Sequence, residues 1–177
     1  MTMRFRPAFC ATGLKRIAEF AVLLGIVLSS GAALAAPKDG QKFGDWTARC
    51  ESDPNDPAAG KRCFVFQSVI DTEKNRPVMM FAVSREPEPR AVIVLPLGID
   101  LRSGIEMTVD ESYAKRHPFI FCVQDGCQSH VKMDESLVGD FKRGLKGSIA
   151  FRTLPGGKIV RIPFSLKGFT AALNSLQ

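Results

Sequence analysis

Apolar and polar positions after residue 42 follow patterns that predict a series of short β-strands. Every second residue of segment 46–51 is apolar, which is the period of a strand with one buried face, and residues 105–109 repeat this alternation. Segments 62–70, 78–83 and 91–95 are apolar on both faces, as a central strand would be. Further strands are predicted over residues 119–123, 126–133, 148–154 and 158–165.

Two segments depart from the strand pattern and predict short helices. Residues 134–143 place apolar side chains at helical spacing, with Asp134 or Ser136 as the N-terminal cap. Residues 168–176 predict a short amphipathic helix or turn. The sequence Pro-Gly-Gly at 155–157 predicts a hairpin between the last two strands.

Many short strands separated by turn signals predict an all-β fold, either a sandwich or a barrel. Ten of the thirteen phenylalanines follow residue 35, and most of them should pack in a core because Phe has no polar tip. Trp46 lies on the apolar face of its strand and is expected in the same core.

The first 35 residues have the three-part pattern of a secretory signal peptide. Four basic residues come first, the apolar stretch 17–33 follows with Glu19 as its single charge, and small residues precede the cleavage point. We place cleavage after Ala35, with cleavage after Ala36 as the alternative. An uncleaved membrane anchor is a further alternative, although the stretch is short for a span of about 20 residues.

Cleavage leaves a loose N-terminal tail over residues 36–42 and a single domain over residues 43–177. It also lowers the formal charge from +6 to +3, and the remaining basic residues are scattered, which argues against nucleic-acid binding. No later apolar run reaches about 18 residues, so we expect no membrane span after the leader. The expected location is the periplasm, the outer cell surface or the medium.

Four cysteines remain after cleavage, an even number that predicts two disulfides in an exported protein. Of the three possible connectivities we favour Cys50 with Cys63 and Cys122 with Cys127, because each pair is local and encloses a turn-rich segment. Zinc binding or redox chemistry is the alternative. It is disfavoured because only one pair has metal-ligand spacing and no C-x-x-C occurs.

Few residues suggest catalysis. The two histidines, His117 and His130, have no metal-ligand spacing, and a triad drawn from His130 and Asp125 lacks any local signature. The acidic pairs at positions 134–135 and 86/88 lack the aromatic platforms of a sugar cleft. We therefore predict no catalytic residue, no metal site, no cofactor and no enzymatic activity. A hydrolase using either histidine is the weakest alternative.

Five short motifs resemble, in order, those of the invasion-associated locus B family of bacterial exported proteins. The resemblance runs from Phe43 to about Asn174 and includes both cysteine pairs. The motifs are Phe43-Gly44-Asp45-Trp46 with Cys50; Cys63, Val65 and Gln67; Leu95-Pro96-Leu97-Gly98-Ile99 with Leu101 and Gly104; Phe119, Cys122, Gly126 and Cys127; and Ile162-Pro163-Phe164-Ser165-Leu166 with Gly168-Phe169.

The resemblance implies an immunoglobulin-like antiparallel β-sandwich in the cell envelope or outside the cell. The family is named for a role in bacterial entry into host cells, and it supplies no catalytic or ligand residue for this chain. The leading hypothesis is a non-enzymatic envelope protein that acts through contacts with an unidentified protein or surface. The alternative is a periplasmic small-ligand carrier with a pocket between the sheets, lined by phenylalanines and methionines. The candidate lining methionines are Met79, Met80, Met107 and Met133.

Overall fold

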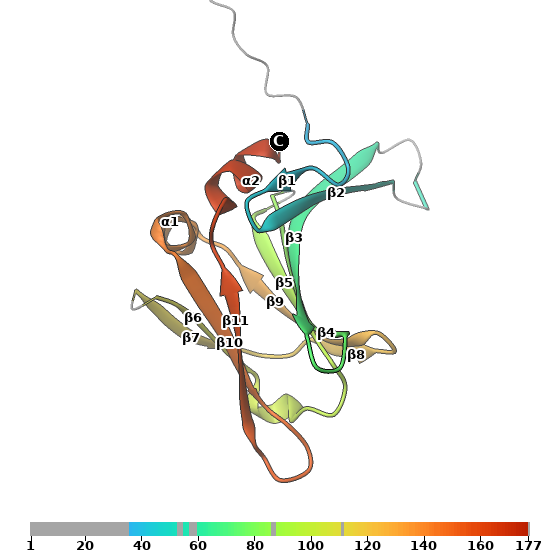
Figure 1. Cartoon of the computed structure of the whole chain (residues 1–177), viewed down its shortest axis with the longest axis vertical. Helices are drawn as coiled ribbons and strands as arrows, with labels where there is room; N and C mark the ends of the chain where they lie inside the picture. Colours follow the sequence, from blue (N-terminus) through green and yellow to red (C-terminus); the bar gives the residue numbers. More distant parts are fainter. Residues whose placement is uncertain (1–35, 53–54, 57–59, 86–87, 111, 177) are drawn as a thin grey trace, which may run out of the picture. The chain divides into compact units, whose positions relative to one another are not determined.

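The structure, a computed structural model, describes residues 36–52, 55–56, 60–85, 88–110 and 112–176. The leader predicted over residues 1–35 lies outside the described residues. The described chain forms two antiparallel sheets and two short α-helices (Figure 1). The predicted all-β antiparallel sandwich with one or two helices is confirmed.

The larger sheet has seven strands in the order β1-β2-β3-β4-β5-β9-β8. The first five form a meander in which each strand pairs with the next, and β9 pairs with β5 and carries β8 at the edge. Its strands are β1 (Lys42–Phe43), β2 (Trp46–Ser52), β3 (Lys61–Asp71), β4 (Arg76–Ser84), β5 (Arg90–Leu95), β8 (Phe121–Val123) and β9 (Gly126–Lys132).

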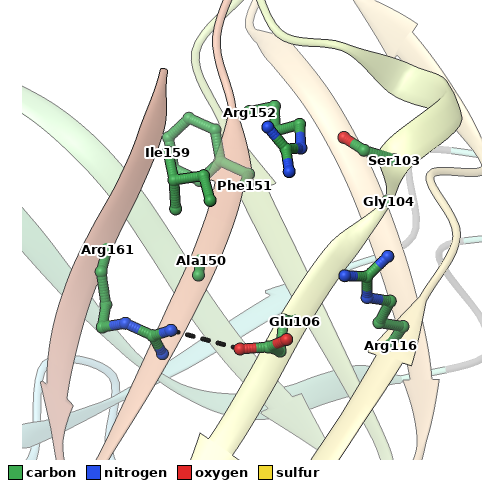
Figure 2. Close-up of a pocket in the computed structure, with 9 residues that line it drawn as sticks. All are labelled: Ser103, Gly104, Glu106, Arg116, Ala150, Phe151, Arg152, Ile159 and Arg161. Carbon is green, nitrogen blue, oxygen red and sulfur yellow. Dashed lines mark hydrogen bonds and ion pairs between the residues drawn. The ribbon is translucent and has the colours of Figure 1, made fainter. Parts of the chain in front are cut away.

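The smaller sheet has four strands in the order β11-β10-β6-β7. A 3-10 turn, η2 (Leu101–Ser103), precedes it. One row of paired residues crosses all four strands, and its side chains lie on the outer face of the sheet (Figure 2). That row is Arg161, Ala150, Glu106 and Arg116. The strands are β6 (Ile105–Val109), β7 (Tyr113–His117), β10 (Lys146–Arg152) and β11 (Ile159–Ser165).

Both helices begin where the sequence predicts. α1 (Glu135–Arg143) is capped by Asp134, whose carboxylate accepts a 2.8 Å hydrogen bond from the backbone N–H of Leu137. α2 (Phe169–Ser175) packs against β1, β2 and α1. Among the described residues, neither helix combines the length and apolarity that a membrane span requires.

The core is built around five fully or almost fully buried aromatic side chains from both sheets and both helices. Their contacting ring centroids lie 4.6–5.9 Å apart. Such pairs stabilise a core by more than the apolar area that they bury. The five are Trp46 of β2, Phe81 of β4, Phe141 of α1, Phe164 of β11 and Phe169 of α2.

A polar side chain also joins the two sheets inside this core. The side-chain amide of Gln67 on β3 donates a 2.7 Å hydrogen bond to the carbonyl of Ser165 on β11. The backbone N–H of Ser165 donates a 3.0 Å bond back to Oε1 of Gln67. Because β11 is an edge strand, Gln67 takes the place of a neighbouring strand at this point.

The two ends of the domain meet through glycines. A Cβ on Gly168, which has a left-handed backbone (φ +87°), would collide with the carbonyl oxygen of Phe43. The Asp45 backbone N–H donates to the Lys167 carbonyl at 3.1 Å, and the Ser165 hydroxyl donates to the Asp45 carboxylate at 2.6 Å. The first and last motifs of the sequence are therefore one structural unit.

The expectation of a loose tail over residues 36–42 needs correction. Pro37 is buried, and backbone hydrogen bonds join Gly40 and Gln41 to Ala48 on β2. The Asp39 carboxylate accepts a bond from the Cys50 N–H. The physical reason is that β2 would otherwise expose unpaired backbone groups along its outer edge.

Candidate binding surface

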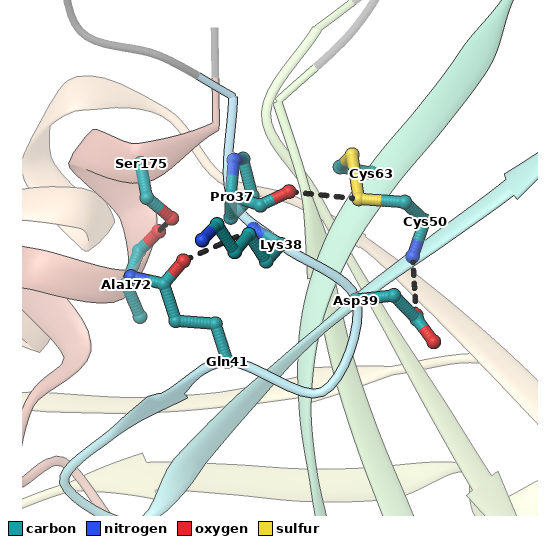
Figure 3. Close-up of a disulfide and its surroundings, with 8 residues drawn as sticks. All are labelled: Pro37, Lys38, Asp39, Gln41, Cys50, Cys63, Ala172 and Ser175. Carbon is teal, nitrogen blue, oxygen red and sulfur yellow. Dashed lines mark hydrogen bonds between the residues drawn. A yellow bond between two sulfur atoms is a disulfide. The ribbon is translucent and has the colours of Figure 1, made fainter.

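Both predicted disulfides are present. Cys50 and Cys63 face each other across β2 and β3, and Cys122 and Cys127 face each other across β8 and β9. Figure 3 shows Pro37 beside the first pair, with its carbonyl oxygen 3.4 Å from Cys50 Sγ. Each bond thus ties two adjacent antiparallel strands at directly opposite positions.

The first disulfide fixes which side of β3 faces the core. Trp46, Ala48 and Cys50 share one face of β2, and Cys63 must share it in order to reach Cys50. Val65 and Gln67 follow Cys63 at every second residue, so they also point inward, and both are buried. The two phenylalanines between them must point outward.

The outer side of the large sheet therefore carries an apolar surface, which we call the outer aromatic face. Two register rows build it. One runs through Phe66, Ala82 and Val92 to His130, and the other runs from Met80 and Val94 across Gln128 to Phe121. Its members are Phe64, Phe66, Met80, Val92, Val94 and Phe121.

The members of the outer aromatic face are accessible to solvent to differing extents. Met80 is 37% exposed and Phe121 is 43% exposed, and the others are half-buried. The rings of Phe64 and Phe66 lie 6.1 Å apart between centroids. Seven of the ten phenylalanines pack in or against the core, as expected for most of them, and Phe64, Phe66 and Phe121 are the three that do not.

Charged residues border the outer aromatic face along one side. The row through Phe64 continues to Arg49 on β2 and, across Ser84, to Arg90 on β5. Arg49 pairs with Glu51 at 3.1 Å, and Lys132 pairs with Glu88 at 2.9 Å. A hydrogen bond and charge attraction from Lys132 lower the pKa of Glu88, so this carboxylate remains ionised near neutral pH.

An apolar centre with a charged border is the usual composition of a protein-binding surface. Sequence reasoning missed this surface because a strand that is apolar on both faces was interpreted as buried on both sides. The sequence does contain the information needed to locate the surface. The Cys50–Cys63 pairing determines which face of β3 points into the core, and the other face is therefore external.

The two histidines lie in separate sheets and make different contacts. His117 on β7 forms a 2.8 Å hydrogen bond through Nε2 with the hydroxyl of Tyr113, and the two rings stack. Burial lowers the pKa of His117, with a further contribution from the positive charge of Lys115. Burial also raises the pKa of Tyr113, with smaller contributions from Asp134 and Asp140. Both side chains are thus favoured in their neutral forms.

The structure does not assemble the triad considered from the sequence. His130 hydrogen-bonds Gln128 through Nε2 at 3.2 Å and lies edge-on to Phe121. Asp125 is exposed in the turn between β8 and β9. His130 therefore belongs to the border of the outer aromatic face.

The acidic pairs have structural contacts. Asp134 caps α1, and Glu88 pairs with Lys132, whereas Glu86 lies outside the described residues. In the described part of the chain, no group of three or more His, Cys, Asp or Glu side chains is placed to hold a metal ion.

The methionines considered for a ligand pocket separate into two environments. Met79, Met107 and Met133 are buried in the core, whereas Met80 lies on the outer aromatic face. A cavity of about 310 Å³ lies beside Cys63, Arg85 and the end of α2 rather than between the sheets. The carrier hypothesis thus lacks a specific observation in its favour.

Comparison with known proteins identifies relatives over most of the chain. The family model described as "Invasion associated locus B (IalB) protein" matches residues 46–177. Two Brucella abortus proteins, from strain 2308 and from biovar 1 strain 9-941, are each named as an invasion protein B homolog. Each is 27% identical over 158 residues, which cover 85% of this chain and 89% of the relative.

A solved structure has the same fold. The crystal structure of invasion associated protein B from Bartonella henselae superposes with a TM-score of 0.67 at 23% identity. The match covers 77% of this chain and 92% of the Bartonella chain. At this level of identity the likeness concerns the fold.

Proposed function

Because the chain belongs to the invasion associated locus B family, we propose that it is an exported, non-enzymatic envelope protein that binds a partner protein. The outer aromatic face is the contact surface in this proposal. The partner should present an apolar patch bordered by charges of both signs, to complement the border around Arg49, Glu51, Glu88 and Lys132.

Two features support export to an oxidising compartment. The first 35 residues have the pattern of a cleavable signal peptide. The four cysteines that remain are joined in two disulfides, which persist in the periplasm or outside the cell and are rare in the cytosol.

The observation that carries the binding proposal is the placement of Phe64, Phe66 and Phe121 on the solvent side of the sheet. Placing these rings in water is unfavourable by the hydrophobic effect, so a partner that covers them gains free energy of association. Aromatic and methionine side chains are enriched where binding energy concentrates. Invasion, which the Brucella relatives' names mention, would require such a contact, and we extend that role to this chain as part of the proposal.

Site-specific crosslinking in the native envelope tests the contact surface. A photoreactive phenylalanine analogue replaces Phe66 or Met80 on the outer aromatic face. The same analogue at Leu145, which is 81% exposed between α1 and β10, is the matched control. We expect one discrete crosslinked species from both face positions and not from Leu145. If this crosslinked species is lost in a Phe121→Ser variant whose thermal unfolding temperature is unchanged, the crosslink is assigned to the outer aromatic face.

The same crosslinked products from all three positions, or none from the two face positions, would contradict the binding proposal. Export has a separate test, which is the intact mass of the protein purified from its native envelope with and without reductant. We expect a chain that begins at Ala36, with no free thiol before reduction and four afterwards. A full-length mass or free thiols would contradict export.

A further inference from the structure

The outer face of the small sheet carries a shallow crevice with a basic border. Its floor is formed by Gly104 of the turn before β6 and by Ala150 of β10, and neither residue has a side chain long enough to fill the space. Arginines from three different strands stand around this floor (Figure 2). The crevice has a volume of about 70 Å³, and its arginines are Arg116, Arg152 and Arg161.

The three arginines differ in whether an acidic side chain balances their positive charge. Arg161 pairs with Glu106 at 3.2 Å and donates a 2.9 Å hydrogen bond to the Ser148 hydroxyl. Arg152 donates to the neutral carbonyl of Gly157 at 3.1 Å, so its charge is not balanced there. Arg116 has no ion-pair partner among the described residues. Arg116 nevertheless lies opposite Glu106 in the β6–β7 register, so the three arginines and this one carboxylate leave the crevice with a net charge of +2.

We propose that this arginine crevice binds a phosphate group. A guanidinium presents parallel N–H donors that match two oxygens of a tetrahedral oxyanion, and two guanidinium groups can engage one phosphate from two sides. A phosphate monoester carries a charge of about −1.5 to −2 at neutral pH. That charge matches the net charge of +2 that the three arginines and Glu106 give the crevice.

The small residues of the floor allow this approach. Ala150 lies between Arg161 and Glu106 in the strand register, and a longer side chain there would extend into the crevice beside their ion pair. Gly104 also lines the crevice, and glycine is favoured there because its backbone is left-handed (φ +63°) and a Cβ would meet the carbonyl oxygen of His117. Glu106 disfavours phosphate binding, because its carboxylate repels an anion and Arg161 only partly neutralises it.

Titration with inorganic phosphate at constant ionic strength tests the proposal on the oxidised protein after leader removal. The readout is the NMR signal of each arginine Nε–H group. We expect saturable shifts of the Arg116 and Arg152 signals. Arg116→Gln or Arg152→Gln should weaken the affinity at least about tenfold, because each removes a charge-assisted bidentate contact. Arg116→Lys should retain part of the affinity, since lysine keeps the positive charge but lacks the parallel N–H donors of the guanidinium group.

Two further variants distinguish specific binding in the crevice from a nonspecific effect of the protein's net charge. Arg49→Gln on the outer side of the other sheet removes the same charge and should leave the affinity within about twofold. Glu106→Gln should strengthen phosphate binding by about three- to tenfold, because it removes a repelling carboxylate and releases Arg161. Equal weakening by Arg49→Gln and Arg116→Gln, or no saturable response in the wild-type protein, would overturn the proposal.

Vesicles distinguish the source of the phosphate. Flotation with vesicles containing phosphatidic acid, whose headgroup is a phosphate monoester, compared with vesicles of phosphatidylcholine alone, tests a lipid headgroup. Retention on phosphatidic acid that is lost in the Arg116→Gln and Arg152→Gln variants would assign the site to a membrane phosphate. Saturable binding of inorganic phosphate without vesicle retention would assign it to a soluble phosphate. Vesicle retention that persists in both variants would contradict the arginine crevice as the site.

Discussion

Gln67 shows how a single polar residue can determine the packing of the two layers. It lies on the inner face of β3 among apolar neighbours, and its amide satisfies both backbone groups of Ser165 on the edge of the other sheet. A buried amide is tolerated only when its donors and acceptors are paired, and Ser165 supplies both partners.

We predict that Gln67→Leu lowers the free energy of unfolding by about 2–3 kcal/mol, because it leaves the N–H and the carbonyl of Ser165 without partners in a largely buried place. Urea denaturation followed by tryptophan fluorescence measures this change. Gln128→Leu, on the outer side of the same sheet, is the matched control and should change stability by less than about 0.5 kcal/mol. An equal effect of the two substitutions would contradict the bridging role.

Gly168 makes the close approach between the two ends of the domain possible. We predict that Gly168→Ala destabilises the protein more than Gly156→Ala does, although both glycines have a left-handed backbone. A Cβ at position 168 meets the Phe43 carbonyl, whereas a Cβ at 156 meets open space. Gly156→Ala should cost about 1 kcal/mol from backbone strain alone, and Gly168→Ala clearly more. Thermal unfolding of both variants gives the comparison, and equal costs would rule out the Phe43 contact as the cause.

At the scale of elements, the disulfides join strands that are already paired, so their main effect is to restrict the unfolded chain. We predict that replacing Cys50 and Cys63 by serine costs about 3 kcal/mol, and that replacing Cys122 and Cys127 costs about 2 kcal/mol. The difference follows from the sequence separations of 13 and 5 residues. Urea denaturation of the two double variants measures both values, and the reverse order would show that strand packing outweighs chain entropy.

Strand β7 has a pH-dependent contribution to stability through His117. Burial lowers the folded pKa of His117, whereas the unfolded side chain takes up a proton near pH 6.5. The unfolded state therefore binds more protons below about pH 6.5, and stability is lost as the pH falls from there to the folded pKa.

We predict that stability falls more between pH 7.5 and pH 5.5 in the wild-type protein than in His117→Gln, which cannot titrate at this position. Urea denaturation at the two pH values measures this difference. Direct NMR titration of the His117 ring should give a pKa below about 6.5. A value at or above that of an unfolded histidine would contradict the burial argument.

The elements differ in how far the sequence predicts them. Strands with a regular period, such as β2 and β6, lie within a residue or two of their predicted positions. β7 was not predicted, because it is an edge strand whose central residues Ala114, Lys115 and Arg116 are all exposed and give no alternation. Its position follows from pairing with β6, which is a tertiary interaction.

The two proposed surfaces differ in the same way. The outer aromatic face could be predicted from the disulfide register, because Cys63 sets the direction of Phe64 and Phe66. The arginine crevice could not, since Arg116 meets Arg152 and Arg161 of the predicted β10–β11 hairpin only because β6 pairs with β10 and β7 pairs with β6. Scattered basic residues in the sequence are thus compatible with a local basic site.

For the molecule as a whole, the two sheets present different chemistry to the solvent. The large sheet exposes phenylalanine, methionine and valine, whereas the small sheet carries three arginines beside the exposed Ile159 and the part-buried Thr108 and Ser148. The shared core lies between them and contains residues from both layers. Because no side chain belongs to both outer faces, we expect the two binding activities to be independent.

We predict that paired variants separate the two activities. With the photoreactive analogue at Met80, Phe66→Ser with Phe121→Ser should abolish the crosslinked species and leave the phosphate affinity unchanged. Arg116→Gln with Arg152→Gln should have the opposite effect, because these residues lie on the other sheet. Crosslinking in the envelope and phosphate titration, both performed on each double variant, give the four results. Loss of both activities in either variant, at an unchanged unfolding temperature, would show instead that one partner spans both faces and that its phosphate is part of a single interface.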